Sequence, residues 1–223
     1  MKLSNETLTV LKNFASINSG IEFKAGNKIA TISSTKTILA KATLKDEFPQ
    51  DFCIYDLNQF LSVHSLYKDS ELDFDASNVI FKSGRSKIKY RMTAKNMIVT
   101  APDKDIPLSN PEVTFTLKDE DYANALKSAA VLQSPNIAIE SDGVKICITT
   151  FNAKDDASHT NSIEVGDGNG TQFKAVFLTE NLKMIPGSYD VKIYSKGLAS
   201  FSHGVEEIDY YIAIEAKESN FGG

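Results

Sequence analysis

The side chains that most often carry enzymatic chemistry are few and scattered in this sequence. The three histidines, His64, His159 and His203, lie far apart and share no ligand-like spacing with one another or with the two cysteines. No serine or cysteine stands in a recognisable nucleophile motif. We therefore predict no catalytic residue, no metal site and no cofactor, and interpret each histidine as a surface or packing residue.

The glycine-rich segment 166–170 is the nearest approach to a ligand-binding loop. Its sequence, Gly-Asp-Gly-Asn-Gly, lacks the lysine and the Ser/Thr of a phosphate-binding loop and does not open a predicted helix. It also lacks the late glutamate of a calcium loop. We interpret it as a flexible hairpin tip.

The composition narrows the class of protein further. Cys53 and Cys147 each lie in an apolar, strand-like run, which indicates reduced core thiols of a cytosolic protein and not a disulfide. The sequence has no apolar run near the ~20 residues of a membrane helix and no signal segment, so we expect no membrane partner. The net charge of −5 argues against a protein that grips nucleic acid over its whole face, but a local basic strip remains compatible with it.

Two lysines stand in equivalent positions on two predicted amphipathic helices. The helix within residues 117–133 has apolar side chains at the spacing i, i+3, i+4, i+7, i+10: Tyr122, Ala125, Leu126, Ala129 and Leu132. Near the start of the chain, the same spacing selects five residues, four of them apolar: Thr7, Val10, Leu11, Phe14 and Ile17. Lys12 and Lys127 each follow the central leucine and should project away from the buried stripe. Exposed lysines are common on any helix, so it is the repeated register that makes these two candidates.

The repeat extends beyond the two helices. Each helix is followed by a strand, a hairpin turn and a second strand, with Gly26-Asn27 in one turn and Asp142-Gly143 in the other. Asp56 and Thr179 then stand at the N-cap position of a second helix in each half. The helix after Asp56 should run to about Leu66, while Pro186-Gly187 should end the other early, and strand-rich sequence follows both. We predict two α+β domains, 1–107 and 108–223, with a turn-rich connector at about 101–111.

A basic segment follows in the first half. Between Ala76 and Pro102 no residue is acidic and six are basic. Lys87, Lys89 and Arg91 alternate with apolar residues, which predicts a strand with one basic face. This face is either solvated sheet surface or a contact with an acidic partner surface.

Several segments resemble the DNA polymerase sliding clamps of T4-like bacteriophages. In the first half these are residues 1–4, 11–15, 17–21 and 54–58, with the sequences MKLS, LKNFA, INSGI and IYDLN. In the second half they are Ile137-Ala138-Ile139, Lys183-Met184 and Pro186-Gly187. The resemblance covers the whole chain and is densest in the first helix and around Tyr55.

This resemblance implies an α+β protein with the DNA-clamp fold, built from two duplicated domains. Each would have two helices on the inner face of a homotrimeric ring and antiparallel sheets outside. Such a ring encircles duplex DNA without sequence preference and tethers the replicative polymerase, so the protein would not be an enzyme. The implied DNA-binding residues are Lys12, Lys68, Lys127 and Lys183. The implied partners are the polymerase C-terminal tail and the clamp loader, with the transcription machinery as a further candidate, in the cytoplasm of the infected bacterial host.

The resemblance also implies a partner pocket beside the connector. Its predicted residues are Pro102, Ile106, Pro107 and Leu108, together with Ile212 from the strand 210–214. Alternatively, Ile106 and Leu108 merely pin the connector to the two cores. For the ring contacts, we expect segment 95–100 to pair as an edge strand with about 158–165 of a neighbouring subunit. The alternative function is that of a phage structural or adaptor protein, built from duplicated β-rich domains, that binds only protein.

Overall fold

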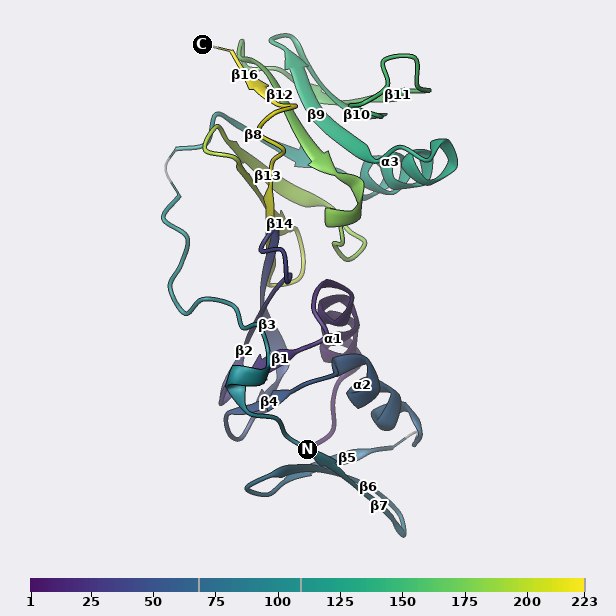
Figure 1. Cartoon of the computed structure of the whole chain (residues 1–223), viewed down its shortest axis with the longest axis vertical. Helices are drawn as coiled ribbons and strands as arrows, with labels where there is room; N and C mark the ends of the chain where they lie inside the picture. The colour runs from purple at the N-terminus through teal and green to yellow at the C-terminus, as the bar shows by residue number, and fades with distance from the viewer. Residues whose placement is uncertain (68, 109, 223) are drawn as a thin grey trace. The chain divides into compact units, whose positions relative to one another are not determined.

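The computed structural model describes residues 1–67, 69–108 and 110–222. The chain forms two compact units, Met1–Asp103 (unit 1) and Lys104–Gly223 (unit 2). The boundary after Asp103 falls inside the segment predicted as a connector, earlier than the predicted domain end at residue 107. Figure 1 labels most elements of both units.

Unit 1 combines two α-helices with two groups of antiparallel strands. Its elements, in chain order, are α1 (Asn5–Ile17), β1 (Ile21–Phe23), β2 (Gly26–Ile32), β3 (Ile38–Phe48), β4 (Phe52–Ile54), α2 (Leu57–Ser65), β5 (Glu71–Phe74), β6 (Asn78–Ser83), β7 (Ser86–Arg91) and the 3-10 helix η1 (Lys95–Met97). The strands of the first group pair in the order β4-β1-β2-β3, and those of the second in the order β5-β6-β7. Figure 1 shows α1 and α2 next to one another beside the first group.

Unit 2 has one α-helix and more strands. Its elements are β8 (Val113–Leu117), α3 (Asp119–Leu132), β9 (Asn136–Asp142), β10 (Lys145–Phe151), β11 (Asn161–Asp167), β12 (Gln172–Leu178), the 3-10 helix η2 (Thr179–Asn181), β13 (Tyr189–Tyr194), β14 (Leu198–His203), β15 (Ile208–Ala213) and β16 (Asn220–Phe221). The strands pair in the orders β11-β10-β9-β12-β16 and β15-β14-β13-β8.

The two units share one topology, which confirms the predicted duplication. The order β4-β1-β2-β3 in unit 1 corresponds to β12-β9-β10-β11 in unit 2, and β5-β6-β7 corresponds to β13-β14-β15. Strand β8 precedes α3 and pairs with β13. Unit 1 begins directly before α1, but Met1 exchanges two backbone hydrogen bonds of 2.7 Å with Leu72 of β5. The N-terminus of unit 1 thus lies where unit 2 has a full strand.

The cores form where helix stripes meet the apolar faces of the strands. In unit 1, Leu11 and Phe14 of α1 are completely buried, and Phe23 of β1 stacks on Phe52 of β4 with ring centroids 4.5 Å apart. Strand β10 of unit 2 alternates buried and half-buried residues along its length, as expected for a sheet with one covered face. Both cysteines are free, Cys53 in the core and Cys147 half-buried.

The second helix of unit 2 is much shorter than its sequence suggests. Residues Thr179–Asn181 form a single 3-10 turn, and Thr179 is its first residue and not the predicted N-cap. The Thr179 hydroxyl instead donates to the Ser134 carbonyl at 2.9 Å. In unit 1 the corresponding prediction is confirmed, because Asp56 caps α2 by accepting from the Gln59 N–H at 3.0 Å.

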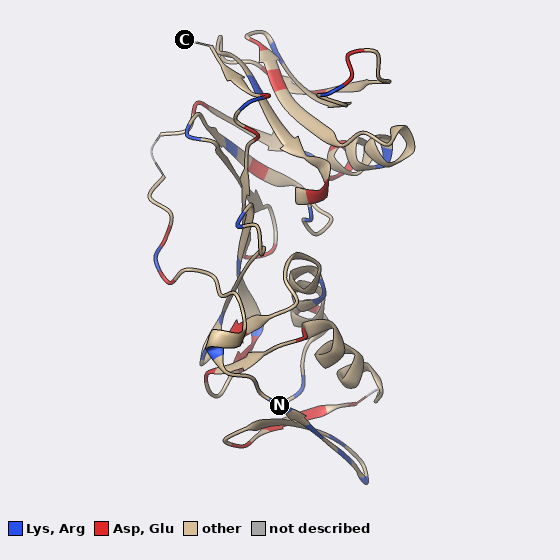
Figure 2. Cartoon of the chain, in the orientation of Figure 1, with Lys and Arg blue, Asp and Glu red and all other residues tan. Residues whose placement is uncertain are grey.

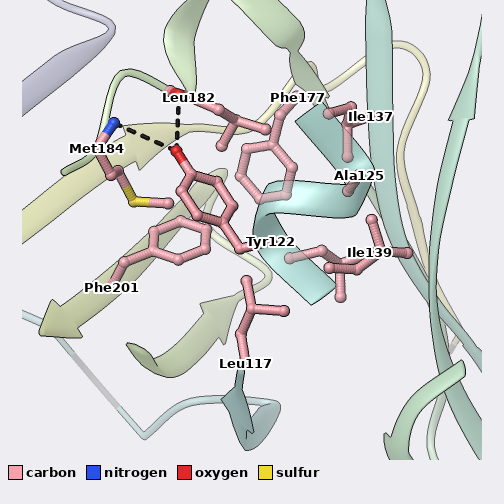
Figure 3. Close-up of a pocket in the computed structure, with 10 residues that line it drawn as sticks. Leu117, Tyr122, Ala125, Ile137, Ile139, Phe177, Leu182, Met184 and Phe201 are labelled. Carbon is pink, nitrogen blue, oxygen red and sulfur yellow. Dashed lines mark hydrogen bonds between the residues drawn. The ribbon is translucent and has the colours of Figure 1, made fainter. Parts of the chain in front are cut away.

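Tyrosine hydroxyls hold the irregular chain that follows η2. Tyr122 donates to the Leu182 carbonyl at 2.9 Å and accepts from the Met184 N–H at 3.3 Å, as Figure 3 shows. Tyr210 accepts from the Ile185 N–H at 3.2 Å, and Tyr189 donates to the Ile185 carbonyl at 2.5 Å. Buried backbone groups need partners, and here side chains replace the hydrogen bonds of a regular helix.

The predicted edge strand at 95–100 is not a strand. Its first residues form η1, and the chain then continues in an extended conformation. There the Val99 carbonyl accepts a hydrogen bond from the Asn18 side chain at 2.9 Å. Strand β7 is instead the last strand of its group, and β11 is an end strand in unit 2, where it belongs to the other group of strands. The segment predicted to pair with it, 158–165, overlaps β11.

Candidate functional site

The orientation of α1 is determined at its first turn. Ser4 caps the helix by accepting from the Thr7 N–H at 3.2 Å. The Ser4 N–H and hydroxyl both donate to Oδ2 of Asp46 in β3, each at 2.7 Å. Partial burial tends to raise the pKa of Asp46. The hydrogen bonds from Ser4 have the larger effect in the opposite direction, so the pKa is lowered overall. A charged, hydrogen-bonded carboxylate therefore joins the start of α1 to β3.

Lys12 is the basic residue of α1 and lies opposite its buried stripe. The exposed side chains around it are Asn5, Thr9 and Ser16. The Thr9 and Ser16 hydroxyls donate to helix carbonyls, at 2.9 Å to Asn5 and 2.6 Å to Asn13. Because these hydroxyls are bound to the helix backbone, the ammonium group of Lys12 is the principal electrostatic feature of this face.

Helix α3 presents Lys127 in the same way. Tyr122, Ala125 and Ala129 are buried, whereas Lys127 is exposed, as are Glu120, Asn124 and Val131 on the same side of the helix. Lys127 is the basic residue of this helix, as Lys12 is of α1, and Figure 2 shows basic residues in blue on both helices. The predicted exposure of both lysines is confirmed, while their contact with DNA stays a prediction.

Lys183 and Lys68 complete the predicted DNA-binding set. Lys183 is exposed, but it lies beyond η2 in the chain held by the tyrosine hydroxyls, and not on a helix. Its neighbours Leu182 and Met184 are buried, so the backbone on both sides of Lys183 is anchored. Lys68 lies outside the described residues.

His64 of α2 belongs to the surroundings of Lys12, which sequence reasoning missed. Its ring is half-buried against Phe81, with ring centroids 6.4 Å apart. Burial, and then the charge of Lys12, lower the pKa of His64. Three-dimensional packing creates this proximity, because α1 and α2 are distant in sequence.

The connector residues differ in exposure. Pro102, Pro107 and Leu108 are exposed and Ile106 is half-buried. Ile212 of β15 is 0% exposed, so the structure places it in the core of unit 2 and not on a partner-binding surface. Strand β15 alternates buried and half-buried residues, and the accessible face carries Tyr211 and Ala213.

Tyr211, on the accessible face of β15, senses the charge of the connector. Burial raises the pKa of Tyr211, and the charges of Asp209 and of Asp105 in the connector add to the effect. The accessible face of β15 and the segment from Asp105 to Leu108 are therefore the candidates for a partner surface in unit 2.

Ion pairs at the end of unit 1 hold the start of the connector. The Lys24 ammonium contacts the Asp103 carboxylate, and Lys95 Nζ lies 2.7 Å from Oε1 of Glu22. The hydrogen bond with Lys24 is the main cause that lowers the pKa of Asp103. The partners of each ion pair are far apart in the sequence and follow no periodic pattern, so the sequence did not predict these ion pairs.

In the part of the chain that the structure describes, neither the apolar pocket of unit 2 nor the metal-ligating types of side chain form a site for a ligand. The pocket in Figure 3 encloses about 10 Å³ among apolar side chains such as Phe177 and Phe201, barely the space of one water molecule. Within residues 1–67, 69–108 and 110–222, no group of three His, Cys, Asp or Glu side chains could hold a metal ion. Nor is any helix in these ranges long and apolar enough to span a membrane.

Comparison with known proteins gives consistent matches over nearly the whole chain. Residues 4–100 match the family described as DNA polymerase processivity factor, and residues 114–216 match the family described as gp45 sliding clamp, C terminal. The chain is 36% identical to the sliding clamp of Enterobacteria phage T4, over 99% of both chains. It is 34% identical to the sliding clamp of Vibrio phage KVP40, over 97% of this chain and 100% of the other.

Solved structures share the fold at low sequence identity. The chain superposes on A. fulgidus PCNA, solved as "C-terminal region of FEN-1 bound to A. fulgidus PCNA", with a TM-score of 0.72 and 15% identity, covering 96% of this chain and 97% of the other. It superposes on the H. pylori beta clamp with a TM-score of 0.71 and 12% identity, covering 96% of this chain and 64% of the other. These likenesses support the α+β clamp fold, and the phage relatives disfavour the alternative of a structural or adaptor protein. The chain belongs to the phage sliding-clamp family of DNA polymerase processivity factors, which are not enzymes.

Proposed function

We propose that this chain assembles into a closed homotrimeric ring around duplex DNA and tethers the replicative polymerase to it. The observation that carries this proposal is the repeated placement of one exposed lysine opposite the buried stripe of α1 and of α3. Three copies of a two-unit chain would place six such helices around a central hole. The family membership and the shared topology of the two units support this arrangement.

The chemistry of these helix faces suits a protein that slides. Lys12 and Lys127 can meet phosphates, and the neutral polar residues around Lys12 (Asn5, Thr9 and Ser16) offer no pattern that reads bases. Contacts of this kind are independent of sequence and weakened by salt, so the ring moves along DNA without a preferred position. A closed ring is then retained by its topology. The net charge of −5 disfavours adhesion of DNA to the outside.

Lys183 would add a third phosphate-binding group in each chain. The hydroxyls of Tyr122, Tyr189 and Tyr210 hold the backbone around it, which fixes the point from which its exposed side chain projects. Lys68 follows α2 in the sequence and remains part of the proposal on the family resemblance.

The ring junctions would form by strand pairing between copies. Strands β7 and β11 end their groups and have half-buried apolar residues on one face: Ile88, Tyr90, Ile163 and Val165. An exposed edge of this kind promotes association. Because the two edges belong to different units, their pairing is head-to-tail, and such pairing closes into a ring when the rotation between successive copies completes a full circle.

The partner surface would consist of Ile106 and Leu108 with the accessible face of β15. A polymerase C-terminal tail could insert apolar side chains here, in place of the predicted contact with Ile212, which is buried. Pro102 and Pro107 restrict the connector and keep it from extending a sheet. The clamp loader, and the transcription machinery as a further candidate, would use the same surface in the cytoplasm of the infected bacterium.

Particle imaging of the purified chain tests the ring directly. We expect round particles with a central hole, and sedimentation at micromolar concentration should give the mass of a trimer. Imaging at a dilution that gives monomers serves as the control. A chain that remains monomeric by sedimentation at all concentrations would rule out the proposed assembly.

A further inference from the structure

The exposed face of β7 carries a row of cations, which Figure 2 shows in blue. Lys87, Lys89 and Arg91 are exposed, and within the described part of the chain they form no ion pair. Lys87 lies directly opposite Lys82 of β6, whose ammonium group binds Asp73 at 2.7 Å. Like charges in opposed positions destabilise a sheet, so this face favours an external anion.

The exposed face of β11 has the opposite charge. Glu164 pairs in register with Cys147 of β10, and Asp167 pairs with Lys145. A β-bulge lies between these two pairs, and its extra residue returns Asp167 to the same face as Glu164. Both carboxylates contact the single ammonium group of Lys145, at 2.8 Å and 2.9 Å. One negative charge of this cluster is therefore not neutralised.

Strands β7 and β11 also resemble one another on their second face, which carries apolar side chains. Ile88 and Tyr90 of β7, and Ile163 of β11, are half-buried and alternate with the charged positions. Pairing of β7 with β11 would bring the half-buried apolar side chains together on one face and the opposite charges together on the other. A pair of β7 strands would oppose cations, and a pair of β11 strands would oppose carboxylates.

We propose that the charges on β7 and β11 select head-to-tail pairing between copies of this chain and exclude like-with-like pairing. The occupant of each edge is thus a second copy of the chain, bound through its other edge. This inference rests on the proposed ring and adds the physical reason for its direction. Strand edges alone would permit two-fold dimers, because any antiparallel edge can pair with itself, and the charge pattern disfavours those dimers.

Charge-reversal variants of the full chain test whether the charges on β7 and β11 select head-to-tail pairing. One variant carries Lys87→Glu and Lys89→Glu, a second carries Glu164→Lys and Asp167→Lys, and a third combines all four. A control reverses two exposed lysines on inner strands, Lys28→Glu of β2 and Lys192→Glu of β13. Sedimentation across protein concentration gives the concentration of half-dissociation of the trimer, and circular dichroism checks that each variant is folded.

We expect each of the first two variants to dissociate at a concentration about tenfold or more above the wild type, because like charges then face one another. The four-fold variant should return to within about threefold of the wild type, and the control should not differ from it. A wild-type trimer whose first two variants associate equally well overturns the charge inference and leaves the ring intact. Folded variants that the four-fold combination fails to restore also overturn it. A wild type that never associates overturns the ring as well.

Discussion

Lys12 of α1 and His64 of α2 are electrostatically coupled, although they belong to different helices. The pKa of His64 is lowered mainly by burial, and the charge of Lys12 is the second cause. The folded-state pKa thus lies below the ordinary value of 6.5. The unfolded chain binds the proton more readily, so the stability contributed by neutral His64 is complete above pH 6.5 and is lost as the pH falls toward the folded-state pKa.

The first prediction concerns this pH dependence. The free energy of unfolding should fall when the pH is lowered from 7.5 to 5.5, and the fall should be smaller in His64→Gln. Urea unfolding at both pH values measures it, with His159→Gln as a matched control at an exposed position. Equal pH dependence in His64→Gln and the wild type would show that His64 does not contribute.

The second prediction concerns the DNA-facing lysines. Replacing Lys12, Lys127 and Lys183 together by Ala should preserve folding, because all three are exposed. Retention on DNA should weaken, and its dependence on the logarithm of salt concentration should become shallower by about 0.9 for each phosphate that the variant no longer neutralises. The measurement is dissociation from circular DNA across a salt titration. The control replaces Lys28, Lys192 and Lys217, which are exposed elsewhere; equal losses in both triple variants would remove the assigned role.

The third prediction concerns the connector. Ile106→Ala with Leu108→Ala should weaken binding of a polymerase C-terminal peptide by about 2 kcal/mol or more, because buried apolar anchors dominate such interfaces. Calorimetry measures the affinity, and sedimentation confirms that the trimer survives. If the peptide binds the variant as it binds the wild type, Ile106 and Leu108 only pin the connector to the fold.

The fourth prediction separates Ile212 from that surface. Because Ile212 is completely buried in β15, Ile212→Ala should leave a cavity and lower the free energy of unfolding by about 2–5 kcal/mol. Ala213→Ser, at a half-buried position of the same strand, should cost much less. Denaturant unfolding distinguishes them. A stable Ile212→Ala chain that fails to bind the peptide would return Ile212 to the partner surface.

The fifth prediction concerns the hydroxyl of Tyr122. Burial raises the pKa of Tyr122 to about 12, so the hydroxyl remains protonated and bound to Leu182 and Met184. Tyr122→Phe would leave both backbone groups unsatisfied, at a cost of about 1–3 kcal/mol in unfolding free energy. The control is Tyr211→Phe, whose hydroxyl has no hydrogen bond within the described residues. Equal stability of the two variants would mean that the chain after η2 is held by other interactions.

The sequence by itself determined the features that depend on local periodicity. The stripes of α1 and α3, the exposure of Lys12 and Lys127, and the cap of α2 by Asp56 all follow from residue spacing along a single helix. The duplication was visible because the same spacing occurs twice. The resemblance to the phage clamps added the function, which periodicity alone does not contain.

The tertiary structure decided the features that depend on distant residues. The sequence after Thr179 has the residues of a helix start, yet it forms one 3-10 turn because tyrosine hydroxyls from α3, β13 and β15 satisfy the following backbone. In β15, alternation separates two faces, but both carry apolar side chains, so only packing buries Ile212 and leaves Tyr211 accessible. The sheet edge lies at β7 and not at 95–100 because strand order is set by pairing between segments far apart in sequence, for which local residue patterns carry no information.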